Sequence, residues 1–189
     1  LAPRSSDAEI EAMLRTGKRP DGSALWEMPS WMFARLSAAD MRDLIAYLRT
    51  VPPAGVDHPR IVMGPGARAE IKAGTFFDET VAIAWFSRAL PIDTGPATAR
   101  GRYIASVTCA ECHGHALDGG KGTLSTPDLR IVAAYDDAQF ATLMNSGRAA
   151  NGREMELMSV VARSRFSHFT VAERDAVRDY LRARAALLR

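Results

Sequence analysis

The sequence Cys109-Ala110-Glu111-Cys112-His113 decides how the rest of the chain is interpreted. Two thiols lie three positions apart and a histidine directly follows the second, which is the attachment pattern for c-type haem. One turn of helix brings Cys109 and Cys112 to one face, where each thiol can bond to a vinyl group of the porphyrin. His113 is then carried beneath the macrocycle, where an imidazole nitrogen can ligate the iron. The motif therefore predicts covalently bound haem c with His113 as an iron ligand.

Three other interpretations of the motif are weaker. A thioredoxin-like dithiol accompanies a βαβ pattern, and no strand pattern flanks residue 109. A structural zinc site needs four ligands, usually with a second cysteine pair, but the chain has only two cysteines. A disulfide between Cys109 and Cys112 would be strained and would leave His113 unexplained.

The composition is that of an ordinary globular protein. Of 189 residues, 47% are hydrophobic and 24% charged, and the length allows one or two small domains. A net charge of +2 gives no strong electrostatic signal for nucleic acid, so no such partner is expected. No apolar run approaches the roughly 18 residues of a membrane helix, so no membrane span is predicted.

The cofactor also bears on location. Covalent attachment of haem normally takes place after export, so the sequence predicts a periplasmic protein. The chain begins at Leu1 and contains no signal peptide, and we expect it to be processed or truncated.

Helix signals run through the chain, and no segment has the alternation of a strand, so an all-α fold is expected. Residues 1–50 are predicted to form helix, loop and helix, and residues 51–96 an ordered connector with short helices at 67–72 and 78–90. Residues 97–189 contain what one haem domain needs, beginning with a helix at 98–109. The arginines of the last helix are expected to form a solvated face. Four helix starts carry N-capping pairs, namely Ser6 with Glu9, Ser37 with Asp40, Asp136 with Gln139, and Thr170 with Glu173.

An internal repeat links the two ends of the chain. Gly17 and Gly147 are 130 positions apart, as are Met28 and Met158. After three inserted residues the spacing becomes 133, which aligns Tyr47 with Tyr180. Residues 1–50 therefore repeat the second half of the haem domain, whereas its first half has no second copy here.

The repeat selects a candidate for the second axial ligand. A methionine thioether opposite histidine is a good ligand for haem iron and raises its reduction potential. Met144, Met155 and Met158 are available, and we favour Met158 because the repeat pairs it with Met28, in the non-helical stretch just before the last helices. Met144, on its capped helix, is expected to be a packing residue, and Met155 is the less favoured alternative ligand. By the same logic Met28 would ligate a second haem, attached to a segment that this sequence lacks.

With these features the chain resembles a bacterial class I cytochrome c, of the two-domain dihaem kind. Besides the haem motif, the resemblance rests on residues 14–22 (LRTGKRPDG), Glu27-Met28-Pro29 and Tyr47-Leu48-Arg49, and it covers residues 1–50 and 97–189. It implies the cytochrome c fold, with one complete haem domain at 97–189 and the C-terminal half of another at 1–50.

The resemblance also assigns roles to single residues. The family's haem-attaching cysteines fall on Cys109 and Cys112, its proximal ligand on His113 and its distal ligand on Met158. The carbonyl of Pro127 would accept a hydrogen bond from the proximal imidazole, which fixes the ring. The family's contact between its first and last helices would place Gly101 and Tyr103 against Tyr180.

Electron transfer is the expected function, and the protein is not expected to be an enzyme. Iron ligated on both sides has no open position for a substrate. A second haem would make the protein a relay between a dehydrogenase or respiratory complex and a terminal oxidase or other acceptor. Its expected partners are these redox proteins and the missing N-terminal segment. The alternative is a haem enzyme or sensor, such as a dihaem peroxidase, with an open iron site.

Overall fold

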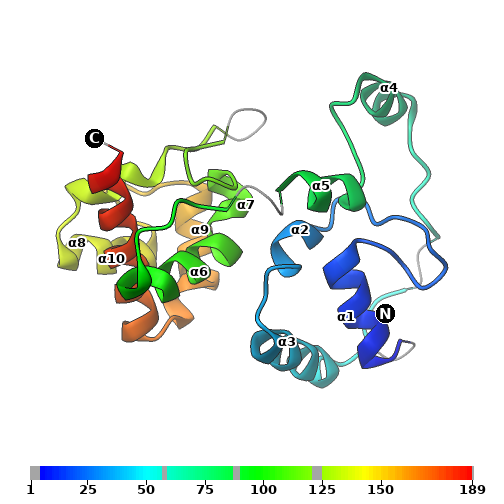
Figure 1. The fold of residues 1–189 in the computed structure, drawn as a ribbon, viewed down its shortest axis with the longest axis horizontal. Helices are drawn as coiled ribbons and strands as arrows, with labels where there is room; N and C mark the ends of the chain where they lie inside the picture. Colours follow the sequence, from blue (N-terminus) through cyan, green and yellow to red (C-terminus); the bar gives the residue numbers. More distant parts are fainter. Residues whose placement is uncertain (1–4, 57–58, 87–89, 121–124, 189) are drawn as a thin grey trace. The chain divides into compact units, whose positions relative to one another are not determined.

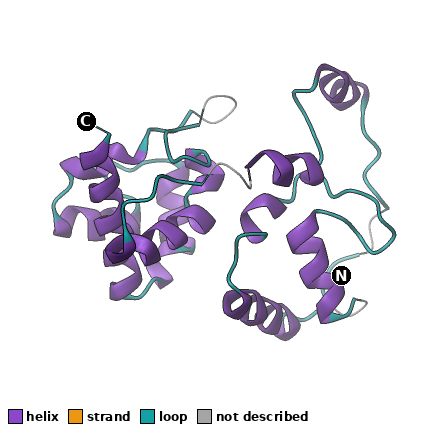
Figure 2. Ribbon diagram, viewed as in Figure 1, coloured by secondary structure: helices purple, strands orange, loops and turns teal. Residues whose placement is uncertain are grey.

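A computed structural model describes residues 5–56, 59–86, 90–120 and 125–188. Over these ranges the chain forms helices, turns and loops, with two isolated antiparallel pairings and no strand (Figures 1 and 2). This agrees with the all-α fold that the sequence predicts. Within the same ranges no helix is long and apolar enough to cross a membrane.

The chain divides into two compact units, Leu1–Ala89 and Leu90–Arg189. The first contains α1 (Asp7–Thr16), α2 (Ser30–Phe33), α3 (Ala38–Thr50), α4 (Pro65–Ala73) and α5 (Glu79–Phe86). The second contains the 3₁₀ helix η1 (Pro96–Thr98), α6 (Ala99–Thr108), α7 (Ala110–His113), the 3₁₀ helix η2 (Leu129–Ala134), α8 (Asp137–Ser146), α9 (Leu157–Ser164), the 3₁₀ helix η3 (Phe166–His168) and α10 (Val171–Leu187).

The first unit is built around the facing apolar sides of α1 and α3. Its buried cluster consists of Ile10, Met13, Leu14, Leu25, Met41 and Ile45, and the half-buried Met28 packs against this cluster. The spacing of these residues on each helix is that of an amphipathic helix with one packed face. The core therefore holds the Met28 segment between two helices.

Helix α5 also belongs to this first unit. The amide of Glu79 donates to the carbonyl of Leu25 at 3.0 Å, and the carboxylate of Glu79 accepts from the amides of Ser30 and Trp31 at the start of α2. Part of the expected connector thus packs on the elements around Met28, whereas α4 has no buried residue. The helix expected at 78–90 is observed over Glu79–Phe86, and residues 87–89 lie outside the described ranges.

In the second unit α10 crosses α6 at very short range. A Cβ atom on Gly101 would lie 1.9 Å from the carbonyl oxygen of Ala176 and 2.8 Å from the Cβ of Tyr180. Tyr180 is fully buried, and its hydroxyl donates to the carbonyl of Ile92 at 3.0 Å. Only a glycine at position 101 allows the helices this approach, and its expected contact with Tyr180 is present.

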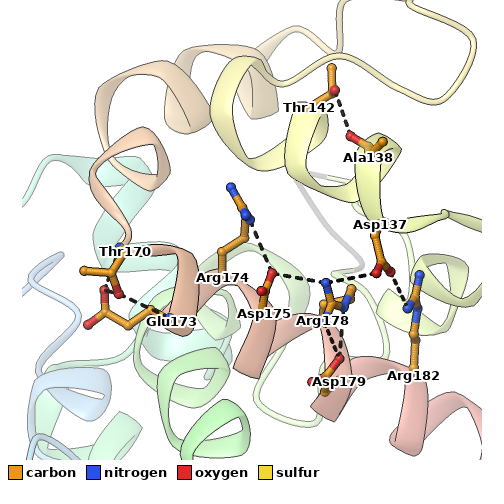
Figure 3. Close-up of polar contacts among 10 residues, drawn as sticks. All are labelled: Asp137, Ala138, Thr142, Thr170, Glu173, Arg174, Asp175, Arg178, Asp179 and Arg182. Atoms are coloured by element: carbon orange, nitrogen blue, oxygen red, sulfur yellow. Dashed lines mark hydrogen bonds and ion pairs between the residues drawn. The ribbon is translucent and has the colours of Figure 1, made fainter.

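The predicted helix starts are all capped as expected. Ser6, Asp136 and Thr170 each form a complete capping box with the residue three positions later, and Ser37 accepts from the amide of Asp40. Figure 3 shows the box of Thr170 and Glu173 at the start of α10. These caps satisfy amides that the first helical turn leaves without partners.

The two ends of the chain make the same local bonds at the repeat spacing. Gly17 ends α1 and Gly147 ends α8, both in the left-handed conformation with φ of 67° and 71°. After each glycine the chain makes one antiparallel pairing, Lys18 with Ala24 in the first unit and Arg148 with Glu154 in the second. The turn that follows α1 therefore has the same structure as the turn that follows α8.

A second set of equivalent bonds joins the helices of each repeat. Arg49 of α3 binds the carboxylate of Asp7 at 2.6 Å and the carbonyl of Ser5 at 2.6 Å. Arg182 of α10 binds the carboxylate of Asp137 at 2.8 Å and the carbonyl of Tyr135 at 2.6 Å (Figure 3 draws its pairing with Asp137). Arg49 therefore holds α3 to the start of α1, and Arg182 holds α10 to the start of α8.

Candidate haem site

The haem motif occupies the joint between α6 and α7. Cys109 is the residue at which α6 ends, and Cys112 and His113 lie in the single turn of α7. The amide of His113 donates to the carbonyl of Cys109 at 3.0 Å, which closes this turn. Cys109 is buried, Cys112 is half-buried, and both are free thiols. The turn thus presents two unpaired sulfur atoms and an imidazole from five consecutive residues.

The imidazole of His113 is held in one tautomer by Pro127. Its Nδ1 lies 2.9 Å from the carbonyl oxygen of Pro127. Because a carbonyl can only accept, Nδ1 must carry the proton, and Nε2 keeps a free lone pair. Burial lowers the pKa of His113, although the bond to Pro127 opposes this effect. A neutral imidazole with one bare nitrogen is the form that ligates a metal.

The loop after α7 is tied back to the motif so that Pro127 can reach the ring. The hydroxyl of Thr126 donates to the carbonyl of Cys112 at 2.5 Å, and the amide of Gly119 donates to the carbonyl of His113 at 2.9 Å. Gly119 has a φ of 99°, and a Cβ there would lie 2.7 Å from the carbonyl oxygen of Thr126. Position 119 therefore requires glycine. The close approach of Gly119 to Thr126 fixes the position of Pro127, the residue after Thr126.

Both thiols are neutral in this environment. Burial raises the pKa of Cys109 to about 11, and burial also raises the pKa of Cys112. The hydroxyl of Thr108 lies 3.5 Å from the sulfur of Cys109. Unpaired, protonated thiols in a poorly solvated place fit a site for a large apolar group. Two thiols and an imidazole with a bare nitrogen are the donor set that covalent haem requires.

The candidate distal ligand lies on another element. Met158 lies in the first turn of α9, so the expectation that it lies in a non-helical stretch was wrong. Both Met158 and Met155 are half-buried. The hydroxyl of Ser159 donates to the carbonyl of Gly147 at 2.8 Å and accepts from the amide of Met155 at 2.7 Å. This bridge fixes the Met155–Met158 turn to the end of α8. Met158 as an iron ligand remains a prediction.

The other two methionines have different surroundings. Met144 is buried in α8, as expected of a packing residue. Met28 lies between Glu27, which has a left-handed φ of 63°, and Pro29, just before α2. In the second unit Leu117 and Glu156 both have a positive φ, of 62° and 45°, and Glu156 lies two positions before Met158. The role of Met28 also remains a prediction.

One residue near the site differs from the sequence prediction. The sequence predicts a solvated face for the arginines of the last helix, but the side chain of Arg184 is only 2% exposed and binds the carboxylate of Asp128 at 2.8 Å. Two signals in the sequence indicate burial. Position 184 continues the apolar stripe of Val177 and Leu181, and the repeat aligns it with the apolar Val51.

Over the described residues, no three His, Cys, Asp or Glu side chains gather as they would around a metal ion held by the protein alone. Comparison with protein families finds a match within the second unit. Residues 98–185 match the family model for cytochrome c. The cytochrome c match contains all of the site residues predicted in the second unit: Cys109, Cys112, His113, Pro127 and Met158. It supports a c-type cytochrome with covalently bound haem c and a function in haem-based electron transfer. Curated proteins gave no match to the chain.

Proposed function

We propose that this protein is an electron carrier in which Cys109 and Cys112 hold haem c and His113 and Met158 ligate its iron. The observation that carries the proposal is the 2.9 Å bond from Nδ1 of His113 to Pro127, inside the cytochrome c match. When bound, haem supplies a one-electron Fe(III)/Fe(II) couple. The chain orients the imidazole, keeps Nε2 bare and shields the site.

A closed ligand set favours a carrier over an enzyme. If Met158 occupies the distal position, both axial positions are filled by the protein and none is open to a substrate. The support for Met158 is its repeat partner Met28 and the fixed turn made by Ser159 and Gly147. One-electron transfer then needs no movement of a ligand.

The visible spectrum of the native holoprotein tests this assignment. We expect the ferric protein to be low-spin with the near-infrared or red-edge band of a methionine–iron bond, and the Met158→Ala variant to lose that band. Met155→Ala is the matched control, since Met155 is also half-buried and lies three positions before Met158. Retention of the band in Met158→Ala would overturn the ligand assignment. A high-spin ferric wild type would instead indicate the haem enzyme or sensor.

We further propose that the first unit belongs to a second haem domain, with Met28 as its distal ligand. The equivalent bonds of Arg49 and Arg182 support this proposal. The face of α3 supports it too, because Tyr47 is 66% exposed whereas its repeat partner Tyr180 is fully buried beneath α6. A haem-attaching segment with a helix like α6 would cover Tyr47. The proposed domain organisation is half of one haem domain at 1–50, an ordered connector at 51–96 and a complete domain at 97–189.

The haem content of the whole natural polypeptide tests the second site. Two haems per polypeptide are expected from intact mass and from the haem absorbance after denaturation. Met28→Leu keeps the side-chain volume but removes the ligand, so it should abolish one of two methionine–iron signals. Met63→Leu, in the connector, should leave both signals intact. One haem per polypeptide would refute this part of the proposal.

The proposed location is the periplasm, and the proposed role is an electron relay. The donor would be a dehydrogenase or respiratory complex, and the acceptor a terminal oxidase or another protein. Fractionation of cells that express the native protein should recover the haem-bearing form from the periplasm. Co-purification with a redox complex would identify the partner, and recovery of holoprotein from the cytoplasm alone would contradict the location.

A further inference from the structure

The guanidinium of Arg184 lies inside the second unit, on the last turns of α10. Its side chain is 2% exposed, and its Nη1 donates to the Oδ1 of Asp128 at 2.8 Å. Its Nε is buried and has no hydrogen-bond partner in the structure. A buried cation with a single strong anchor depends on that anchor, because an unpaired buried charge is costly.

Asp128 is joined by the peptide bond to Pro127, whose carbonyl holds His113. The carboxylate of Asp128 also accepts from the amide of Arg130 at 2.8 Å and so caps the start of η2. The Nε of Arg130 also donates to the Oδ2 of Asp128 at 2.7 Å. The position of Asp128 is therefore fixed on one side by η2 and Arg130 and on the other by Arg184 from α10. The carbonyl of Pro127 lies at the near end of this fixed segment, 2.9 Å from Nδ1 of His113.

These contacts form a continuous path from α10 to the imidazole. It runs from Arg184 to Asp128 through a charged hydrogen bond, along one peptide to Pro127, and through a neutral hydrogen bond to His113. Groups that hold a ligand's hydrogen-bond partner tune the ligated metal as well as orienting the ring. Arg184 is 56 positions from Asp128 and 71 from His113, so the path is set by tertiary packing.

We propose that Arg184 is a positioning residue for the proximal ligand: through Asp128 it keeps the Pro127 carbonyl on Nδ1 of His113 and sets the reduction potential. This inference rests on the proposed ligation of iron by His113. It assigns to a buried arginine a role in the redox site that neither its distance along the chain nor its residue type indicates.

The two members of the pair have opposite electrostatic effects on the iron. Loss of Arg184 leaves the negative charge of Asp128 less compensated, which favours the ferric state and lowers the potential. Loss of the Asp128 charge leaves the positive charge of Arg184, which favours the ferrous state and raises the potential. Removal of both charges should bring the potential back toward the wild-type value. A purely structural role would not produce shifts of opposite sign.

The test uses the native holoprotein and the variants Arg184→Met, Asp128→Asn and the double variant. We expect hydrogen exchange of the His113 Nδ1 proton in the ferrous protein, followed by NMR, to be about tenfold faster in each single variant. We expect the equilibrium constant for reduction to fall about tenfold in Arg184→Met and to rise about tenfold in Asp128→Asn. For a one-electron couple a tenfold change is about 59 mV. Arg184→Lys should recover part of both effects.

Arg178→Met is the matched control. Arg178 lies on the same helix, and its substitution by methionine also removes one positive charge. Its partners, however, are Asp137, Asp175 and Asp179 (Figure 3). It should change neither the exchange rate nor the potential appreciably. Equal shifts in Arg178→Met and Arg184→Met, or an unchanged Nδ1 exchange rate in both single variants, would overturn the inference. The wild-type spectrum separates this failure from failure of His113 ligation, since a missing low-spin haem spectrum would refute the proposed function itself.

Discussion

Arg182 of α10 and Asp137 of α8 form an ion pair at 2.8 Å, and Arg49 and Asp7 form the equivalent ion pair at 2.6 Å in the other unit. Each arginine also binds a carbonyl two residues before its aspartate. The pairing is thus one stabilising device used in both units. Its equivalence is evidence that the repeat in sequence is also a repeat in structure.

Arg182→Met and Arg49→Met should each destabilise only the unit that contains them. The ion pairs are partly exposed, so each is worth little by itself, but the bonds to carbonyls add to them. We expect a loss of about 1 kcal/mol in the free energy of unfolding for either variant. Urea unfolding followed by tryptophan fluorescence reports the first unit, because Trp26, Trp31 and Trp85 all lie there. Haem absorbance reports the second unit, and the exposed Arg153→Met is the control.

Gly101→Ala should be severely destabilising for the second unit. The new methyl group would lie 1.9 Å from the backbone oxygen of Ala176, and backbone cannot move aside as a flexible side chain can. We expect a loss of about 3 kcal/mol or more in the free energy of unfolding, measured by urea with haem absorbance. Gly66→Ala in α4 is the counterpart, because nothing lies within 4 Å of its Cβ position. That variant should be neutral or slightly stabilising, and equal losses in both would contradict the proposed crossing.

The second unit should lose stability in acid through Asp128. Burial alone would raise the pKa of Asp128, but the amide of Arg130 and the guanidinium groups of Arg184 and Arg130 together hold it below its usual value. A carboxylate with a lowered folded pKa contributes stability that is present above its unfolded pKa, about 3.9, and is lost as pH falls through the folded value. Asp128→Asn should flatten this part of the stability profile, measured by urea unfolding between about pH 5 and pH 2.

Glu79 should give the first unit the opposite dependence on pH. Burial raises the pKa of Glu79, and the nearby charges of Asp78 and Glu27 raise it a little further. The hydrogen bonds from the amides of Trp31 and Ser30 lower it but do not cancel the effect of burial. The contribution to stability is therefore present below the unfolded pKa, about 4.3, and is lost as pH rises through the folded value. Glu79→Gln keeps an acceptor for the two amides and should remove this loss. Tryptophan fluorescence during urea unfolding measures it, with the exposed Glu70→Gln as the control, and an unchanged profile in Glu79→Gln would contradict the assignment.

The features that sequence predicts well are those decided within a few residues. The Cys109–His113 motif, the caps at Ser6 and Thr170, and the helix ends at Gly17 and Gly147 all depend on local chemistry. The bond between His113 and Pro127 follows from the family resemblance and not from spacing. The same is true of the contact of Gly101 with α10.

What could not be predicted depends on where distant segments meet. Arg184 lies on a helix rich in solvated arginines, and only its place on the apolar stripe distinguishes it from them. Glu79 lies in a stretch rich in glycine and proline, and no local pattern shows that it will pack on Gly17 and the start of α2. Both are charged groups whose burial is decided by a partner more than 45 positions away, so composition and periodicity suggest exposure.

Because α5 packs back on α1 and α2, the stretch between α2 and α5 is a loop with both of its ends held in the first unit. Helix α4 buries no side chain, so we expect a single proteolytic cut there to be tolerated. The two pieces would still be held together by the contacts of Glu79 with Gly17 and Leu25. The methionine segment of the first unit would then keep its support without an intact backbone, so gel electrophoresis would show cleavage before the fluorescence showed any unfolding.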